Sequence, residues 1–137
     1  MVVLGKGAHT PDCKPELIKP QIEESLERLK LPKIDIYCLH RDNNEIPVSE
    51  FIDALDEIKA EGLINNIGAS NWNLHRFSAA RSYALKNNKE PFTVLSNNFS
   101  LAEMLEPVWP GCVAINNQYL DYIKSNKIKL FPWSSTA

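Results

Sequence analysis

Short β-rich runs alternate with longer runs of helical period along the chain. In the helical runs, apolar residues recur three or four positions apart, as on one face of an amphipathic helix. The first of these runs carries its apolar face on Ile18, Ile22, Leu26 and Leu29. The predicted helices are residues 15–31, residues 47–61, a segment carrying Leu74, Phe77, Ala80 and Ala84, and residues 117–125. The predicted strands are residues 2–6, 34–40, 64–69, 92–95 and 128–133.

Prolines, glycines and asparagines mark several boundaries of these elements. Pro15 suits the first turn of its helix, where the missing N–H costs nothing, whereas Pro20 is expected to be tolerable only near that turn. Gly62 suits a left-handed stop at the end of the second helix. Either Asn71 or Asn73 can cap the third helix.

The order of elements predicts a single α/β domain over residues 1–137, with five parallel strands joined by crossover helices. An irregular stretch, residues 97–116, interrupts the alternation before the last helix. Two architectures satisfy this order: an open doubly wound sheet and a closed barrel. Neither of the glycine-rich phosphate-loop motifs occurs, which weakens the nucleotide-binding open sheet without excluding it.

Composition narrows the class of protein. The chain has 137 residues, 44% of them hydrophobic and 23% charged, with a net charge of −2, as expected for one globular domain. Its 15 lysines and arginines are scattered, so we expect no nucleic-acid partner. No apolar run approaches the ~20 residues that span a bilayer, and no signal peptide is evident, so we expect no membrane partner. Three widely spaced cysteines argue against a disulfide framework or a zinc site and favour a cytoplasmic setting.

Polar residues follow most of the predicted strands. In parallel α/β folds, the functional site lies at the carboxyl ends of the strands. In chain order, the residues at these ends are Lys6; His40, Arg41 and Asp42; Ser70 and Asn71; Ser96, Asn97 and Asn98; and Trp133, Ser134 and Ser135. A lysine and a histidine that end adjacent strands would both point into the opening at the carboxyl ends of the strands. Ordinary loop polarity would also place polar residues here.

Three motifs resemble those of one enzyme family. Residues 24–29 read ESLERL and residues 34–40 read IDIYCLH, similar to the "SL-x-RL … (I)DLY-x-LH" signature of the aldo-keto reductases. Residues 61–71 read EGLINNIGASN and resemble that family's "EGKI-x-x-IG-x-SN". The motifs occur in order over nearly the whole chain and cover the third to seventh barrel strands of the family. The resemblance therefore implies a partial TIM-type (β/α) barrel.

The resemblance also implies NADP(H)-dependent hydride transfer to a small carbonyl substrate. In the family, a tyrosine donates the proton, a lysine lowers the pKa of that tyrosine, an aspartate pairs with the lysine, and a histidine orients the carbonyl. Lys6 matches the lysine and His40 matches the histidine. The family's aspartate and tyrosine lie upstream of the lysine strand, where five residues precede Lys6, and none of the four tyrosines here is at a matching position.

For the cofactor, the resemblance implies contacts at three strand ends. Ser70 and Asn71 match the pair that binds the nicotinamide carboxamide, and Trp133, followed by Ser134, matches the aromatic ring that stacks on the nicotinamide. The family's glutamine on its sixth strand has no clear counterpart, and the nearest residues are Ser96 and Asn97. The eighth strand, with the basic residues that grip the adenosine phosphate, is absent, so NADP(H) binding is expected to be weak.

Ordinary structural roles compete with some of these assignments. Lys6 is alternatively a solvated loop lysine, and His40 a structural histidine at a strand end. Cys38 lies within a strand and is interpreted as a small core residue. Trp72 and Trp109 either line a substrate pocket or pack beside a loop.

Three functions follow from these residues. The first is a fragment of an NADP(H)-dependent aldo-keto reductase, an oxidoreductase that reduces aldehydes and ketones to alcohols, inactive as the isolated chain. The second is a non-catalytic truncated paralogue with a structural or interaction role, which the missing proton donor favours. The third makes Lys6 a Schiff-base lysine of another (β/α) barrel, as in aldolases, and the motif order argues against it. Because five strands leave two edges, at residues 2–6 and 128–133, we expect a homo-oligomer.

Overall fold

The chain is described by a computed structural model over residues 2–4, 13–102 and 104–134, with residues 2–4 described as backbone. The five strands of its sheet are β1 (Val2–Leu4), β2 (Ile34–Leu39), β3 (Ile64–Ser70), β4 (Val94–Ser96) and β5 (Lys129–Leu130). The helices are α1 (Pro15–Leu29), α2 (Val48–Ala60), α3 (Leu74–Lys86) and α4 (Asn117–Ser125). The first strand was predicted to end at Lys6, which lies outside the described residues.

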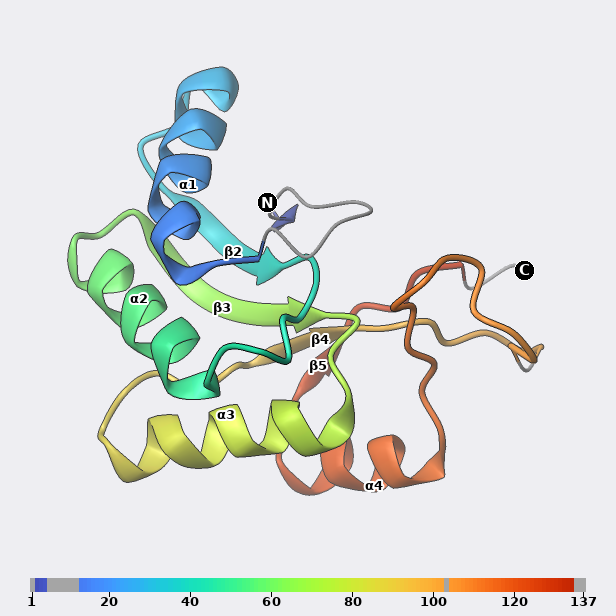
Figure 1. The fold of residues 1–137 in the computed structure, drawn as a ribbon. Helices are drawn as coiled ribbons and strands as arrows, with labels where there is room; N and C mark the ends of the chain where they lie inside the picture. Colours follow the sequence, from blue (N-terminus) through green and yellow to red (C-terminus); the bar gives the residue numbers. More distant parts are fainter. Residues whose placement is uncertain (1, 5–12, 103, 135–137) are drawn as a thin grey trace.

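The order of the strands decides between the two predicted architectures. All four neighbouring pairs are parallel, and the order in the sheet is β1-β2-β3-β4-β5, the same as in the chain. A doubly wound sheet would reverse direction at a switch point and carry helices on both faces. Here the sheet curves and the helices cover its outer face (Figure 1), as right-handed crossovers that always step the same way require. The chain therefore forms part of a (β/α) barrel, as predicted.

Helix α1 ends two residues earlier than predicted. Lys30 adopts the left-handed conformation, with φ 54°, and the N–H of Leu31 donates to the carbonyl of Leu26 at 3.1 Å. Leu29 is consequently 44% exposed and does not belong to the buried face on which it was predicted. Pro20 lies inside the helix, beyond the first turn, so our expectation for it was wrong. It is exposed, and water can hydrate the carbonyl that loses its partner there.

The C-terminal stop of α2 and the N-terminal cap of α3 are among the predicted residues. Gly62 has φ +83°, and its N–H donates to the carbonyl of Lys59 at 2.9 Å, as in a left-handed helix stop. Before α3, the side-chain oxygen of Asn73 accepts from the N–H of Arg76 at 2.9 Å. Asn73 is therefore the cap of α3, and Asn71 has another role, in the pocket described below.

The last strand is shorter than predicted, but its pairing with β4 extends further. The N–H groups of Lys129, Phe131 and Trp133 donate in turn to carbonyls in or beside β4, and the last of these bonds, to Asn97, is 3.5 Å long. Pro132 falls between these donors, so its missing N–H faces the free edge, where proline is tolerated. Trp133 is thus held beside the end of β4 even though β5 itself ends at Leu130. Similarly, β4 begins and ends slightly later than the predicted residues 92–95.

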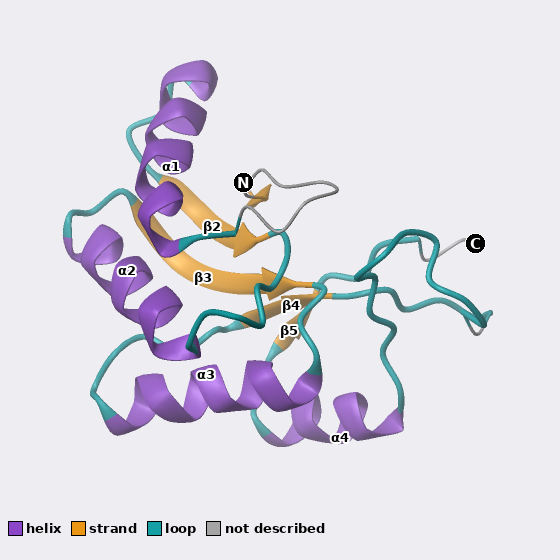
Figure 2. Ribbon diagram, in the orientation of Figure 1, coloured by secondary structure: helices purple, strands orange, loops and turns teal. Residues whose placement is uncertain are grey.

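The hydrophobic core lies between the sheet and its helices, and aromatic rings form its centre. Trp72 packs edge-on against Phe51 and Phe92, with ring centroids 5.6 and 5.2 Å apart. Phe77 stacks on Phe92 with centroids 5.6 Å apart. Trp72 is fully buried in this cluster, so of its two predicted roles the structure gives it packing. Outside the core, the long segment between β4 and α4 leaves the sheet at the carboxyl ends of the strands (Figure 2).

Candidate functional site

Alternate side chains of β2, β3 and β4 lie on the inner face of the sheet, opposite the helices. Cys38, Gly68 and Val94 are neighbours in register. Most residues beside them in the chain belong to the helix-facing core: Tyr37, Leu39, Ile67, Ala69 and Leu95. A Cβ built on Gly68 would lie 2.7 Å from Cys38 Sγ and 2.8 Å from Val94 Cβ, which places all three on one face. Cys38 is fully buried there, in agreement with its prediction as a core residue. Two residues further along the strands, the same alternation brings together His40, Ser70 and Ser96.

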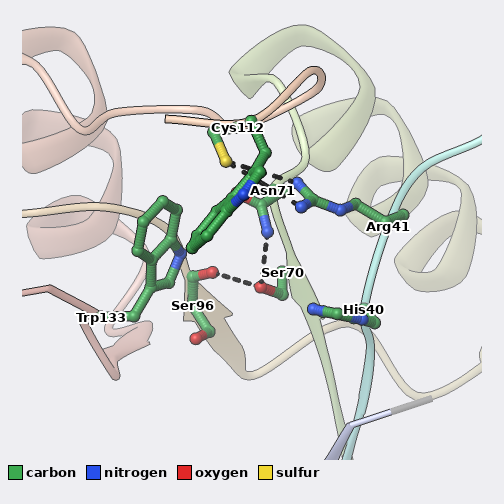
Figure 3. A pocket seen from close by; sticks show the side chains of 8 residues that line it. His40, Arg41, Ser70, Asn71, Ser96, Cys112 and Trp133 are labelled. Atoms are coloured by element: carbon green, nitrogen blue, oxygen red, sulfur yellow. Dashed lines mark hydrogen bonds between the residues drawn. The ribbon is translucent and has the colours of Figure 1, made fainter. Parts of the chain in front are cut away.

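These three side chains line one pocket of about 190 Å³ at the carboxyl ends of the strands. Its described lining is completed by Arg41, Asn71, Trp109, Cys112 and Trp133. Figure 3 shows Trp133 and Arg41 on opposite sides of the pocket, with the two serines between them. Four successive strands thus each contribute at least one predicted site residue to the same space.

Hydrogen bonds join the ends of β3 and β4 beneath this pocket. The hydroxyl of Ser70 donates to the carbonyl of Ser96 at 2.6 Å, and Asn71 Nδ2 donates to Ser70 Oγ at 3.1 Å. The side chain of Asn97 uses both ends of its amide: Oδ1 accepts from the N–H of Asn71 at 2.7 Å, and Nδ2 donates to the carbonyl of Trp72 at 3.0 Å. Asn97 is fully buried and outside the described lining, so Ser96 is the residue of β4 that faces the pocket.

Asn71 has an unusual backbone conformation, with φ 57°. Asparagine adopts this left-handed region more readily than most residues with a side chain. Its N–H is fixed by Asn97, and its Oδ1 accepts from the N–H of Val113 at 3.2 Å. The conformation is therefore held from β4 on one side and from the following long segment on the other.

That long segment returns across the pocket at residues 111–115. Asn98, just after β4, anchors it: its N–H donates to the carbonyl of Val113 at 3.0 Å, and its own carbonyl accepts from Ile115 at 2.9 Å. From the other side, Arg41 Nη1 donates to the carbonyl of Gly111 at 2.9 Å. The segment predicted to be irregular therefore forms a wall of the pocket.

Two lining residues, Arg41 and Cys112, were not predicted as pocket residues, and Trp109 was predicted either to line a pocket or to pack beside a loop. Trp109 and Cys112 lie in a stretch without periodicity, so nothing in the sequence indicated which of its side chains turn inward. Trp109 was considered for a pocket, and the structure places it there with half of its surface exposed. Arg41 was visible as the residue that follows a strand-end histidine, but polarity alone did not distinguish it from Asp42.

Asp42 turns away from the pocket and pairs with Arg76 of α3. The two side chains form bonds of 2.7 and 3.0 Å, and Arg76 also donates to the carbonyls of Asn43 and Ile46 at 3.0 and 2.9 Å. Burial raises the pKa of the Asp42 carboxyl, and the bonds from Arg76 act against that effect. This pair ties the loop after β2, which carries His40 and Arg41, to the start of α3.

The remaining predicted site residues have different outcomes. Lys6 lies outside the described residues. Ser134 is exposed, has φ 54°, and is not part of the described lining. Trp133 lines the pocket, and its buried indole Nε1 has no hydrogen-bond partner among the residues that the structure describes.

No tyrosine lies in the described lining of the pocket. Tyr37 is buried on the helix-facing side of β2, where burial raises the pKa of its hydroxyl. Tyr83 donates to the carboxylate of Asp53, and Tyr119 donates to the carbonyl of Trp72. Tyr122 packs edge-on against a phenylalanine of α3. The tyrosines in this part of the chain therefore serve packing and structural hydrogen bonds.

The lining of the pocket is suited to bind a ligand that carries a neutral carboxamide on a flat ring. After its internal bonds, Asn71 retains one N–H donor and one lone pair on Oδ1, and Ser70 retains one acceptor lone pair. A carboxamide, with one carbonyl oxygen and two N–H donors, complements that set, and the indole of Trp133 offers an aromatic face. Among the described residues, no three metal-ligating side chains gather into a site. None of the helices described has the length and apolar content of a membrane span.

The relatives found by sequence comparison include aldo-keto reductases. A model of the aldo/keto reductase family matches residues 1–137. An aldo-keto reductase of Fusarium vanettenii is 27% identical over 116 residues, which are 85% of this chain and 29% of the relative. Aflatoxin B1 aldehyde reductase member 2 of Mus musculus is 37% identical over 59 residues, 43% of this chain and 16% of that protein. The chain thus spans less than a third of the length of these curated relatives.

Solved structures share the fold. The glycerol dehydrogenase of Gluconobacter oxydans superposes with a TM-score of 0.72 at 22% identity, over 88% of this chain and 32% of that one. An aldo-keto reductase of Klebsiella pneumoniae in complex with NADPH superposes with a TM-score of 0.70 at 22% identity, over 97% of this chain and 40% of that one. Together with the family match over all 137 residues, the strand order and the converging strand ends lead to one conclusion: the chain belongs to the aldo/keto reductase family.

Proposed function

We propose that this chain supplies the carbonyl- and nicotinamide-facing part of an NADP(H)-dependent oxidoreductase that reduces small aldehydes or ketones to alcohols. One observation carries the proposal: His40, Ser70, Ser96 and Trp133, each assigned from its own strand end, line one pocket. The choice of cofactor is supported by structural neighbours from Klebsiella pneumoniae that contain NADP or NADPH.

Each lining residue has a chemical role in this proposal. When bound, a nicotinamide cofactor supplies a hydride. Asn71 and Ser70 hold the carboxamide through the donor and acceptor positions that their internal bonds leave available. Trp133 covers one ring face and keeps water from it. His40 orients the substrate carbonyl by hydrogen bonding, while Asn97 keeps Asn71 in the conformation that this binding needs.

Titration with NADPH, followed by nicotinamide fluorescence, tests this function on the 137-residue chain. We expect weak, saturable binding, with an affinity no tighter than micromolar, because the residues that would grip the adenosine phosphate are not among those identified here. Ser70→Ala and Trp133→Leu should each weaken it, whereas Ser82→Ala, at an exposed position of α3, should not. The absence of saturable binding would refute the proposal, and submicromolar binding would contradict the expected weakness.

A second candidate is a non-catalytic paralogue with a structural or interaction role. The tyrosines favour it, because none lies in the described lining, and a general acid typically contributes about 10²–10⁴-fold to the rate. We accordingly expect no measurable reduction of an aldehyde panel by the 137-residue chain. Turnover well above background that disappears in His40→Ala would eliminate this candidate. We also expect a cytoplasmic setting, because the cysteines at positions 13, 38 and 112 are free thiols.

A further inference from the structure

The pocket contains a cation to which the described residues supply no carboxylate partner. Arg41 lines it beside seven residues that are neutral apart from the titratable His40. In the described part of the chain, its contacts are a 2.9 Å bond from Nη1 to the carbonyl of Gly111 and two long contacts, of 3.8 and 3.9 Å, to Cys112 Sγ. Both acceptors are uncharged, so none of these described contacts neutralises the guanidinium charge.

The nearest acid in the sequence is directed elsewhere. Asp42 pairs with Arg76 through bonds of 2.7 and 3.0 Å, on the side of the loop that faces α3. Arg76 therefore has a partner of opposite charge, whereas Arg41 has none within residues 13–102 and 104–134. This distribution leaves a positive charge at the pocket and a neutral pair behind it.

The guanidinium retains hydrogen-bonding capacity. It carries five N–H donors in a fixed plane, and one strong acceptor, the Gly111 carbonyl, uses one of them. Sulfur is a weak acceptor, so the contacts to Cys112 are readily exchanged for bonds to an oxyanion. Figure 3 shows the guanidinium of Arg41 directed toward Cys112 and Asn71 over the pocket, not away from it.

We propose that Arg41 selects carbonyl substrates that carry a carboxylate. The inference rests on the proposed function, since it assumes that the pocket holds a carbonyl compound, and it adds the class of compound. Arg41 provides the counter-charge for the carboxylate at one side of the pocket, and His40, the preceding residue at the end of the same strand, serves the carbonyl. A competing role, in which Arg41 merely secures residues 111–112, predicts no preference between charged and neutral substrates.

Two probes of matched size test this proposal on the 137-residue chain in the presence of NADPH. 4-Carboxybenzaldehyde is an anion at neutral pH, and 4-formylbenzamide is its neutral counterpart. We expect the carboxylate to bind about tenfold more tightly, as for a charge-assisted hydrogen bond. The ratio of the two affinities should fall to about one in Arg41→Gln. It should keep an intermediate value in Arg41→Lys, which retains the charge but not the planar guanidinium group. Arg28→Gln, at an exposed position of α1, should leave the ratio unchanged.

The ratio of the two affinities separates charge selection from loop anchoring. If Arg41→Gln loosens residues 111–112, both probes weaken together and their ratio stays as in the unaltered chain, which overturns the proposal. Equal binding of the two probes to the unaltered chain overturns it without any variant. If neither probe binds at all, the proposed function fails, and the selection by Arg41 fails with it. A preference that also disappears at high ionic strength, at which charges are screened, supports the proposal.

Discussion

The side-chain oxygen of Asn97 accepts a 2.7 Å hydrogen bond from the backbone N–H of Asn71. The first residue lies after β4 and the second after β3, so this bond locks two strand ends of the barrel together. It also holds Asn71 at a positive φ, and the same Asn97 amide bonds Trp72 at the beginning of the next loop. The geometry of the pocket floor therefore depends on a residue that does not face the pocket.

Asn97→Ala should destabilise the protein and weaken NADPH binding together. It removes two hydrogen bonds to buried backbone groups, from the N–H of Asn71 and to the carbonyl of Trp72. Each group keeps one longer bond, to the Ser96 carbonyl at 3.4 Å and from the Tyr119 hydroxyl at 3.3 Å, so we expect a loss of about 1–3 kcal/mol in total. Urea unfolding gives the loss of stability, and nicotinamide fluorescence gives the affinity. Asn126→Ala is the control: that asparagine makes one exposed bond at the end of α4, and we expect less than about 1 kcal/mol there. Equal losses for the two variants would contradict the assigned role.

Gly68→Ala should destabilise the inner face of the sheet. The added Cβ would lie 2.7 Å from Cys38 Sγ and 2.8 Å from both Cβ and the carbonyl oxygen of Val94. Overpacking of this kind costs about 1–3 kcal/mol. The double variant with Cys38→Ala removes the sulfur contact but not the backbone contact, so it should recover only part of the loss beyond the cost of Cys38→Ala alone. Full additivity of the two single changes in thermal unfolding would argue against this packing.

Stability should fall at alkaline pH because of Cys38. Burial raises the pKa of its thiol from 9.0 to about 12. Between these values the folded chain keeps a proton that the unfolded chain releases, so rising pH favours unfolding, by up to about 1.4 kcal/mol per pH unit. The stabilising effect is complete below pH 9 and is lost toward pH 12. Tyr37, whose pKa burial also raises, acts in the same direction.

Urea unfolding at several values between pH 8 and pH 11 measures that slope. Cys38→Ala removes one titrating group, so its stability should decline less steeply than that of the unaltered chain, while Tyr37 maintains a residual slope. An identical decline in both proteins would show that the buried thiol is not responsible.

Arg76→Gln should cost far more than the loss of an ordinary surface ion pair. It would leave the carboxylate of Asp42, whose side chain is 8% exposed, without its partner, and breaking such a buried pair costs about 3–5 kcal/mol. Arg28→Gln offers a matched comparison, because its 3.4 Å pair with Glu24 is exposed and worth about 0.3–0.5 kcal/mol. Denaturant midpoints of the two variants within error of each other would disprove the anchoring role of Arg76.

The 137-residue chain should associate in solution. As described, its sheet is open, with β1 at one edge and β5 at the other, and unpaired strand edges favour pairing with another chain. We expect light scattering at micromolar concentration to give a mass above the 15.5 kDa of one chain. A mass of about 15.5 kDa would instead mean that the edges are covered within the monomer.

Much of the fold was predictable because its signals are local. The helical period placed α2 and α4 within a residue or two of their observed bounds, and Gly62 marked the stop of α2. Errors arose at boundaries that the sequence does not mark, either because a single lysine adopts an unusual conformation or because pairing with another strand decides. The end of α1 follows from the left-handed conformation of Lys30, and the extent of β5 follows from its pairing with β4.

The site was predictable only where a regular strand delivers the side chain. His40, Ser70, Ser96 and Trp133 were identified at strand ends, and the structure brings them to one pocket. Asn97 stands one residue beyond Ser96, and alternation along the strand turns it to the other side, into the core. Arg41, Trp109 and Cys112 reach the pocket through loop conformations held by long-range hydrogen bonds, for which the sequence has no periodic signature.

The long span between the two sides of the pocket affects how the protein is made. Arg41 bonds Gly111, which lies 70 positions later in the chain, and the ribosome adds Trp133 after both. At about 5–20 residues per second, the ribosome takes several seconds to pass from His40 to Trp133. During that time β2, Arg41 and β3 are made before the residues that cover their inner face. A nascent chain at this stage presents exposed sheet surface to other nascent chains and to chaperones, until residues 111–133 arrive to close the wall.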